Sequence, residues 1–151
     1  MALHSALTDS DGIHEPKGIS TASNNRVYVS NGSGSGAWAA TYYTVNATFP
    51  DVTVADILYI PIPYAGTVAR VMTCLEGAIT GANETITARN AAGASMGTIT
   101  ITQVGSAAGN VGVLNPVTNN TIAANSFVQV ETAGASTGPQ SCQVTIVIER
   151  T

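Results

Sequence analysis

The sequence predicts an all-β protein, a single β-sandwich of about eight strands preceded by an extended N-terminal arm. Three observations predict it. From Thr41 onward, short runs rich in Val, Ile, Thr and Tyr are separated by clusters of Gly, Asn, Pro and Ser. Apolar and polar residues alternate within several of these runs, as in strands with one buried face. The best helix candidate, residues 53–56, covers only about one turn.

The arm, residues 1–40, comes first in the chain. Residues 1–25 show no sustained period of 2 or 3.6 and are rich in loop-forming residues. A short strand is predicted at 26–29. The run 31–36, Asn-Gly-Ser-Gly-Ser-Gly, predicts a flexible hinge. Trp38 follows it, and we expect this side chain to anchor the arm to the body.

The body, residues 41–151, contains the predicted strands. Their ranges are 42–47, 57–62, 67–75, 84–88, 98–103, 112–117, 127–131 and 142–149. Ile99 and Ile101 share one face of their strand, while Val144, Ile146 and Ile148 share one face of theirs, so these faces should meet across the core. The turn spacing predicts a sandwich. A jelly roll is favoured, with an immunoglobulin-like topology as the alternative.

Charged residues make up only 9% of the chain, against about a quarter in typical domains. The five basic residues are scattered and the net charge is −4, so nucleic acid is not an expected partner. No apolar run approaches the roughly 20 residues of a membrane span, and the start lacks signal-peptide features. We therefore expect no membrane partner and synthesis in the cytoplasm. Strands without charge pair readily with other chains, which predicts an oligomer.

The reactive side chains do not predict an enzyme, a metal or a cofactor. Cys74 and Cys142 lie in apolar runs, which favours reduced core thiols over a disulfide. His4 and His14 both lie in the arm, and the body has neither histidine nor lysine. A catalytic triad within the body is therefore excluded. Residues 9–12, Asp-Ser-Asp-Gly, are similar to the start of a calcium loop but are followed by too few oxygen ligands.

Sugar chemistry is a minor alternative. A glycosidase needs two carboxylates across an aromatic cleft, and the body offers Asp51, Asp56, Glu76, Glu84, Glu131 and Glu149 as candidates. Aromatic residues make up only 5% of the chain. A platform for sugar stacking would use Tyr42, Tyr43, Tyr59 and Tyr64. Packing against neighbouring strands is the commoner role of such tyrosines.

The most distinctive motif of the arm is Ile13-His14-Glu15-Pro16-Lys17-Gly18-Ile19. Pro16 restricts its own backbone and that of Glu15, so the segment loses less entropy when it docks into a groove. Ile13 and Ile19 are expected to fill apolar pockets, while Glu15 and Lys17 set the register. The alternative is a solvated loop.

Residues 12–19, then 22–29 and the Gly/Ser run closed by Trp38, resemble the leading segment of tailed-bacteriophage virion proteins. The body is similar to a capsid decoration, or cement, protein. The resemblance implies homotrimers on the capsid surface of the virion that bridge subunits of the major capsid protein and stabilise the head. It also implies that residues 13–19 dock onto the capsid or an adjacent decoration subunit. The strand composition also fits the alternative, a tail-fibre or receptor-binding head that recognises a host surface glycan.

Overall fold

The structure, a computed structural model, describes residues 22, 24–32 and 36–151. The docking motif 13–19, both histidines and residues 9–12 lie outside the described residues. The described residues form eleven strands and no helix, so the prediction of an all-β protein is confirmed. They separate into two compact units with the division after Thr41.

The first unit is a β-hairpin. Strand β1 (Arg26–Ser30) pairs antiparallel with β2 (Gly36–Ala40). Tyr28 and Trp38 are opposite each other in this ladder, and their rings meet edge to face with centroids 5.3 Å apart. The strand predicted at 26–29 is present as β1, whereas β2 was not predicted. The Gly/Ser run connects the two strands.

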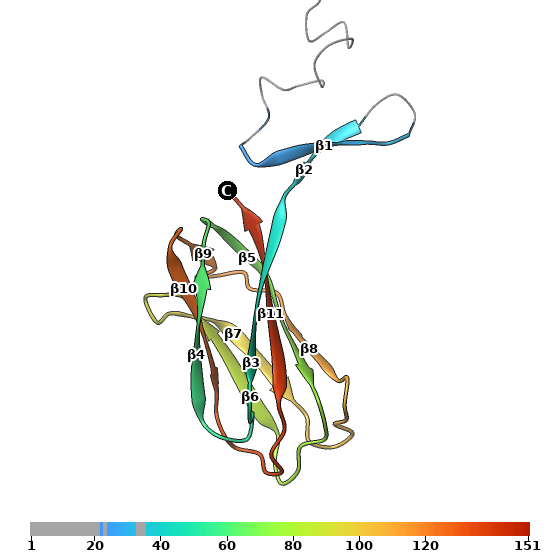
Figure 1. The fold of residues 1–151 in the computed structure, drawn as a ribbon, viewed down its shortest axis with the longest axis vertical. Helices are drawn as coiled ribbons and strands as arrows, with labels where there is room; N and C mark the ends of the chain where they lie inside the picture. The colour runs from blue at the N-terminus through green and yellow to red at the C-terminus, as the bar shows by residue number, and fades with distance from the viewer. Residues whose placement is uncertain (1–21, 23, 33–35) are drawn as a thin grey trace, which may run out of the picture. The chain divides into compact units, whose positions relative to one another are not determined.

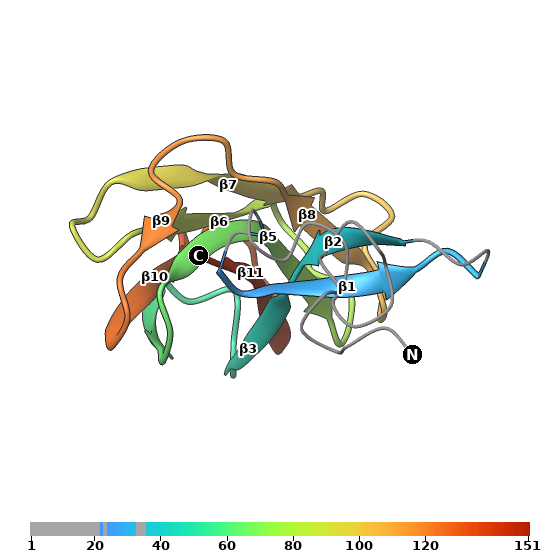
Figure 2. The same ribbon diagram turned by 90° about the horizontal axis from the view of Figure 1, so that it is seen from above.

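The second unit is a sandwich of two antiparallel sheets (Figures 1 and 2). One sheet has the order β4-β10-β6-β7, formed by Asp56–Ile62, Ser126–Thr132, Glu84–Arg89 and Ser95–Ile101. The other has the order β3-β11-β5-β8, formed by Tyr42–Phe49, Cys142–Arg150, Gly66–Leu75 and Val111–Leu114. The short β9 (Thr121–Ile122) also pairs with β5.

The strand order identifies the topology as a jelly roll. With β9 set aside, the first strand of the body pairs with the last, as β3 with β11, and the second with the seventh, as β4 with β10. The remaining pairs are β5 with β8 and β6 with β7. This nested pairing alternates between the two sheets, as in a jelly roll. The jelly-roll prediction is confirmed and the immunoglobulin-like alternative is wrong, because the first two strands of the body do not pair.

All eight predicted strands are present, and their bounds differ from the prediction by one or two residues in six strands and by three residues in β7 and β8. Strand β7 begins three residues before the predicted start at 98 and ends at Ile101. Strand β8 ends at Leu114, ahead of Pro116, because the residue before a proline is sterically restricted and proline cannot donate to a ladder. The helix candidate at 53–56 is a turn that leads into β4.

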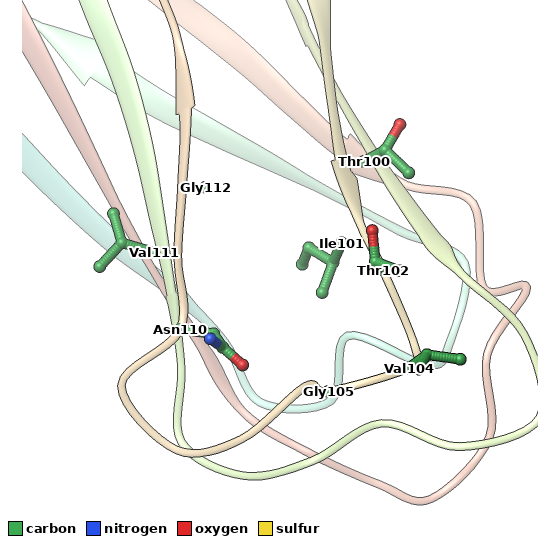
Figure 3. Close-up of a pocket in the computed structure, with 8 residues that line it drawn as sticks. All are labelled: Thr100, Ile101, Thr102, Val104, Gly105, Asn110, Val111 and Gly112. Atoms are coloured by element: carbon green, nitrogen blue, oxygen red, sulfur yellow. The ribbon is translucent and has the colours of Figure 1, made fainter.

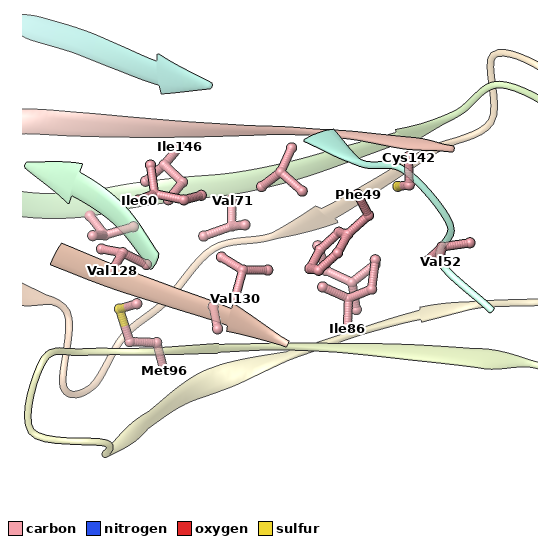
Figure 4. Packing of buried hydrophobic residues seen from close by; sticks show 14 of the residues in the cluster. Phe49, Val52, Ile60, Val71, Ile86, Met96, Val128, Val130, Cys142 and Ile146 are labelled. Carbon is pink, nitrogen blue, oxygen red and sulfur yellow. The ribbon is translucent and has the colours of Figure 1, made fainter. Parts of the chain in front are cut away.

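The core lies between the two sheets (Figure 4). Ile99 and Ile101 project into it from β7, and Val144, Ile146 and Ile148 project into it from β11. The prediction that these faces meet is confirmed. Phe49, at the end of β3, is the aromatic residue of the buried cluster. Alternation along each strand therefore leaves the opposite faces of both sheets for solvent or for partners.

Candidate interaction surfaces

The tyrosines of the body are packed separately and do not form one platform. Tyr42 and Tyr43 are neighbours on β3, so they point to opposite faces of their sheet. Tyr43 meets Tyr64 edge to face at 5.9 Å, and its hydroxyl donates to the Tyr64 carbonyl oxygen. Burial raises the pKa of Tyr43. Tyr59 lies on the other sheet, against Phe127 at 5.3 Å.

Glu84 is a fully buried carboxylate at the start of β6. Its Oε1 accepts hydrogen bonds from the backbone N–H groups of Thr85, Ala133 and Gly134, each at 3.0 Å. Its Oε2 accepts from the N–H groups of Ala135 and Ser136 and from the Ser136 hydroxyl at 2.9–3.0 Å. Six donors therefore saturate the carboxylate. It fastens the 133–136 loop to β6 and is not available for acid–base chemistry.

Gly134 allows this loop to wrap around Glu84. Its φ of 66° lies in the left-handed region, which residues with a Cβ rarely adopt. A Cβ at this position would also collide with the backbone of Val54 and Ala55. The burial of Glu84 could have been predicted from the sequence. Glu84 alternates with Ile86 and Ala88 along β6, so the three side chains share the inward face of this strand.

Three further carboxylates of the body are engaged by neighbouring side chains. Glu131 pairs with Arg89 across β10 and β6 at 2.5 Å. Glu76 accepts from the Ser141 hydroxyl and from the Gln143 amide, and these hydrogen bonds hold its pKa below the ordinary value. Asp51 accepts from the hydroxyl and N–H of Thr53, which lowers its pKa in the same way.

Cys74 and Cys142 are free thiols on opposite faces of one sheet. Cys142 is buried in the core, while Cys74 is opposite Gln143 on the outer face. Burial raises the pKa of the Cys142 thiol to about 11. Among the described residues, no cluster of three or more His, Cys, Asp or Glu side chains is placed to hold a metal ion. The described part of the chain also contains no helix long and apolar enough to cross a membrane.

The first candidate interaction surface is the outer face of β4 and β10, formed by Ile57, Tyr59, Pro61 and Phe127. Pro61 is directly opposite Phe127 in the ladder. Ile57 and Tyr59 are exposed apolar side chains, at 42% and 61%. Next to them is an open hollow of about 490 Å³ lined by Val45, Pro61, Ile62, Pro63, Asn125 and Ser126. Aromatic side chains of this kind supply much of the binding energy in protein interfaces.

The second candidate surface lies at the opposite side of the sandwich, where β7 and β8 are the last strands of their sheets. A hollow of about 240 Å³ opens between them. In Figure 3, Ile101 occupies the space between the strands, and Val111 lies beyond β8. No titratable side chain lines this hollow, whose walls come from residues 100–112.

The comparisons with known proteins concern the fold. No protein-family model and no curated protein match the chain. A chain of the acidic stable capsid structure of Helicobacter pylori bacteriophage KHP30 has a similar structure, with a TM-score of 0.51 at 11% identity, over 72% of this chain and 86% of that chain. A chain of the cyanophage Pam1 capsid asymmetric unit has a TM-score of 0.45 at 14% identity, over 74% and 86%. The likeness to the KHP30 chain shows a shared β-sandwich fold.

Proposed function

We propose that the protein is a structural component of a phage virion. In this proposal it binds the outer surface of the capsid as a homotrimer and stabilises the shell by bridging subunits of the major capsid protein. Residues 13–19 form the docking segment, and Trp38 anchors the arm to the body. The proposed role consists of binding alone, with no catalytic step, cofactor or metal.

The observation that carries this proposal is the fold. The KHP30 capsid structure contains a chain that this protein matches over 86% of its length. The chemistry of the body supports the same role, because six donors bind the buried Glu84 carboxylate and the carboxylates of Asp51, Glu76 and Glu131 are engaged by neighbouring side chains. The separate packing of the tyrosines gives no comparable support to the glycan-binding alternative.

Multivalency supplies the mechanism of stabilisation. Each trimer presents three arms, and the engagement of one arm raises the effective concentration of the other two. Individually weak contacts then hold neighbouring capsid subunits together. Because Pro16 restricts the backbone of the docking segment, ordering it on the capsid costs less entropy.

Binding to expanded phage heads tests the docking segment. A variant lacking residues 1–25 should fold and lose co-sedimentation with heads, because the body is a separate compact unit. The double substitution Ile13→Asp with Ile19→Asp should weaken binding strongly, since both proposed pocket-filling side chains become charged. Leu3→Asp with Leu7→Asp is the matched control in the same arm and should bind as the wild type does.

Retained binding by the arm-deleted variant would contradict the docking role. The place of the protein in the virion is a separate measurement, made by antibody-gold electron microscopy on particles from its source. Label over the whole head supports decoration. Label confined to the tail tip would support the receptor-binding alternative instead, and absence of label would contradict any virion role.

A further inference from the structure

One long stretch of the chain carries no charge. The 41 consecutive residues 90–130 contain no Asp, Glu, Lys, Arg or His. At the usual share of charged residues, roughly ten would be expected in a segment of this length. The stretch includes β7, β8, β9 and the first part of β10, together with the connections between them.

The jelly roll places most of this stretch, β7 and β8 with the connections around them, along one side of the sandwich, whereas its last residues in β10 pair with β4. Strand β7 is the last strand of one sheet, β8 is the last strand of the other, and the two strands are in contact. We call this surface, formed by β7, β8 and residues 102–110 and 115–120, the charge-free side. The opposite side of the body, at β3 and β4, carries Asp51 in its connection and Asp56 at the start of β4.

Exposed valines lie on β8 and in the connections before and after it. Val104 and Val117, which precede and follow this strand, are 80% and 88% exposed. Val111 and Val113 lie on its outer face and are about half exposed. Exposed apolar side chains with no charge among them are typical of an interface core rather than of a free surface.

The edge strands on this side lack the usual protection against pairing. Proteins discourage strand addition with charged residues or prolines at sheet edges. On the other side, β4 carries both, in Asp56 and Pro61. Neither β7 nor β8 contains a charged residue or a proline, and β3, the edge strand beside β4, contains neither as well. The β7–β8 side is therefore the side of the sandwich on which both edge strands lack this protection, and it suits the close approach of another chain.

The charge of the body indicates that the chain that approaches the β7–β8 side is a second copy of this protein. The body has six carboxylates and three arginines, a formal charge of −3, so two copies repel each other over most orientations. A charge close to a rotation axis meets its own symmetry copies, and such like-charge juxtaposition costs several kcal/mol. A surface without charge avoids that repulsion. We propose that the charge-free side faces the rotation axis of a homo-oligomer and forms the contact between copies of this chain.

This inference rests on the proposed function and names the surface through which the subunits of the proposed homotrimer contact each other. Arg70 and Arg89 lie at the flanks of the charge-free side and are already engaged within the molecule. Arg70 donates to the Asn115 side-chain oxygen at 3.3 Å, and Arg89 pairs with Glu131. Both arginines therefore border the interface and leave its centre neutral.

The oligomeric mass of the full chain in solution tests the interface. Val113→Glu places a carboxylate at the centre of the proposed contact and should weaken self-association at least about 100-fold, as unpaired charges buried at interfaces do. Thr44→Glu is the matched control, because Thr44 is also exposed on the outer face of an edge strand of the same sheet. Sedimentation equilibrium should find the wild type and T44E oligomeric and V113E monomeric.

Circular dichroism first establishes that each variant is folded. If V113E fails to fold, Val117→Glu decides in its place, since Val117 lies outside the strands and is almost fully exposed. A monomeric wild type, an oligomeric folded V113E, or equal dissociation of T44E would overturn the inference. Head binding is scored separately: an intact oligomer that does not bind heads contradicts the docking role and leaves the interface standing.

Discussion

At the residue scale, Glu84 is the side chain whose role is most sharply defined by its contacts. Buried carboxylates are costly unless every lone pair is used. Six donors from Thr85 and residues 133–136 satisfy this requirement at 2.9–3.0 Å. The loop is thereby fixed to β6, although the two segments are about 50 residues apart in sequence.

Glu84→Gln tests how much the six hydrogen bonds to the Glu84 carboxylate contribute to stability. A glutamine amide turns one accepting oxygen into a donor, so three of the six donors lose their acceptor whichever way the amide is oriented. The free energy of unfolding should fall by roughly 2–4 kcal/mol, measured by urea denaturation. Glu76→Gln, at an exposed carboxylate, is the control and should change stability little. Equal urea midpoints for E84Q and the wild type would contradict a stabilising role of these hydrogen bonds.

Cys142 predicts a loss of stability in alkali. Burial raises the pKa of its thiol from the ordinary 9.0 to about 11, so the fold favours the protonated form. The corresponding stability is fully present below pH 9 and is lost as the pH rises through 11. The free energy of unfolding should therefore decline between pH 9 and 11, and less steeply in Cys142→Ala. Burial also raises the pKa of Tyr43. This group therefore adds a decline of the free energy of unfolding with pH to the wild type and to Cys142→Ala alike.

Urea unfolding at pH 8, 9, 10 and 11 measures this dependence. Parallel curves for the wild type and C142A would show that the Cys142 thiol contributes nothing to it. Alkylation at pH 8 gives an independent readout, because Cys74 is partly exposed and Cys142 is buried. One thiol should react in the folded protein and two after unfolding.

At the element scale, the β1–β2 hairpin allows the anchor prediction to be tested. An isolated two-stranded sheet is marginally stable in water. Trp38 is the single tryptophan of the chain, so its fluorescence reports on the hairpin. If Trp38 anchors the arm to the body, its emission should change in the same urea transition as the circular dichroism of the body strands.

Tyr28→Ala is the control for this experiment. It removes the ring that Trp38 contacts within the hairpin, so it should shift the emission of Trp38 while leaving the circular dichroism midpoint in place. A transition of Trp38 at clearly lower urea than that of the body strands would contradict the anchor. The hairpin would then unfold as an independent element.

The same scale explains the two edges of the sandwich. Pro61 and Asp56 make β4 a poor template for strand addition, whereas β7 and β8 offer uncharged ladders. The exposed Tyr59 and the partly buried Phe127 therefore suit side-chain docking, and the β7–β8 side suits close approach of backbones. The two candidate surfaces differ in the kind of contact that they can make.

At the scale of the whole molecule, the nested pairing brings the two ends of the body together. Tyr42, the first residue of β3, is opposite Glu149 near the end of the chain. The body thus begins and ends at one end of the sandwich. The two whole-molecule predictions, head binding through residues 13–19 and self-association through the charge-free side, concern different parts of the chain. Separate variants can therefore abolish one and spare the other.

The strand pattern could be predicted because it is local. Val144, Ile146 and Ile148 alternate with polar residues, and such alternation survives in any sandwich with one buried core. The hairpin strand β2 could not be predicted in this way, since Gly36, Ala37 and Ala39 have low β-propensity. Its extended form depends on pairing with β1.

The candidate surfaces were only partly foreseeable. The scarcity of charge and the unprotected strands predicted contact with other chains, but not which strands lie at the edges. Tyr59 and Phe127 are 68 residues apart, and their contact depends on the pairing of β4 with β10. The hydrogen-bond partners of Glu84 in residues 133–136 likewise could not be predicted from the residues next to it in sequence.

The sequence by itself determined the all-β class, the strands, their buried faces and the absence of charge from residues 90–130, because these follow from residue type and local spacing. Only the tertiary structure decided that β3 pairs with β11, that a loop closes over Glu84, and that the uncharged strands β7 and β8 lie together at one side. The first two of these features depend on contacts between segments about 50 to 100 residues apart, and the third on how the two sheets are stacked. Local patterns do not specify such contacts, because many strand orders bury the same faces.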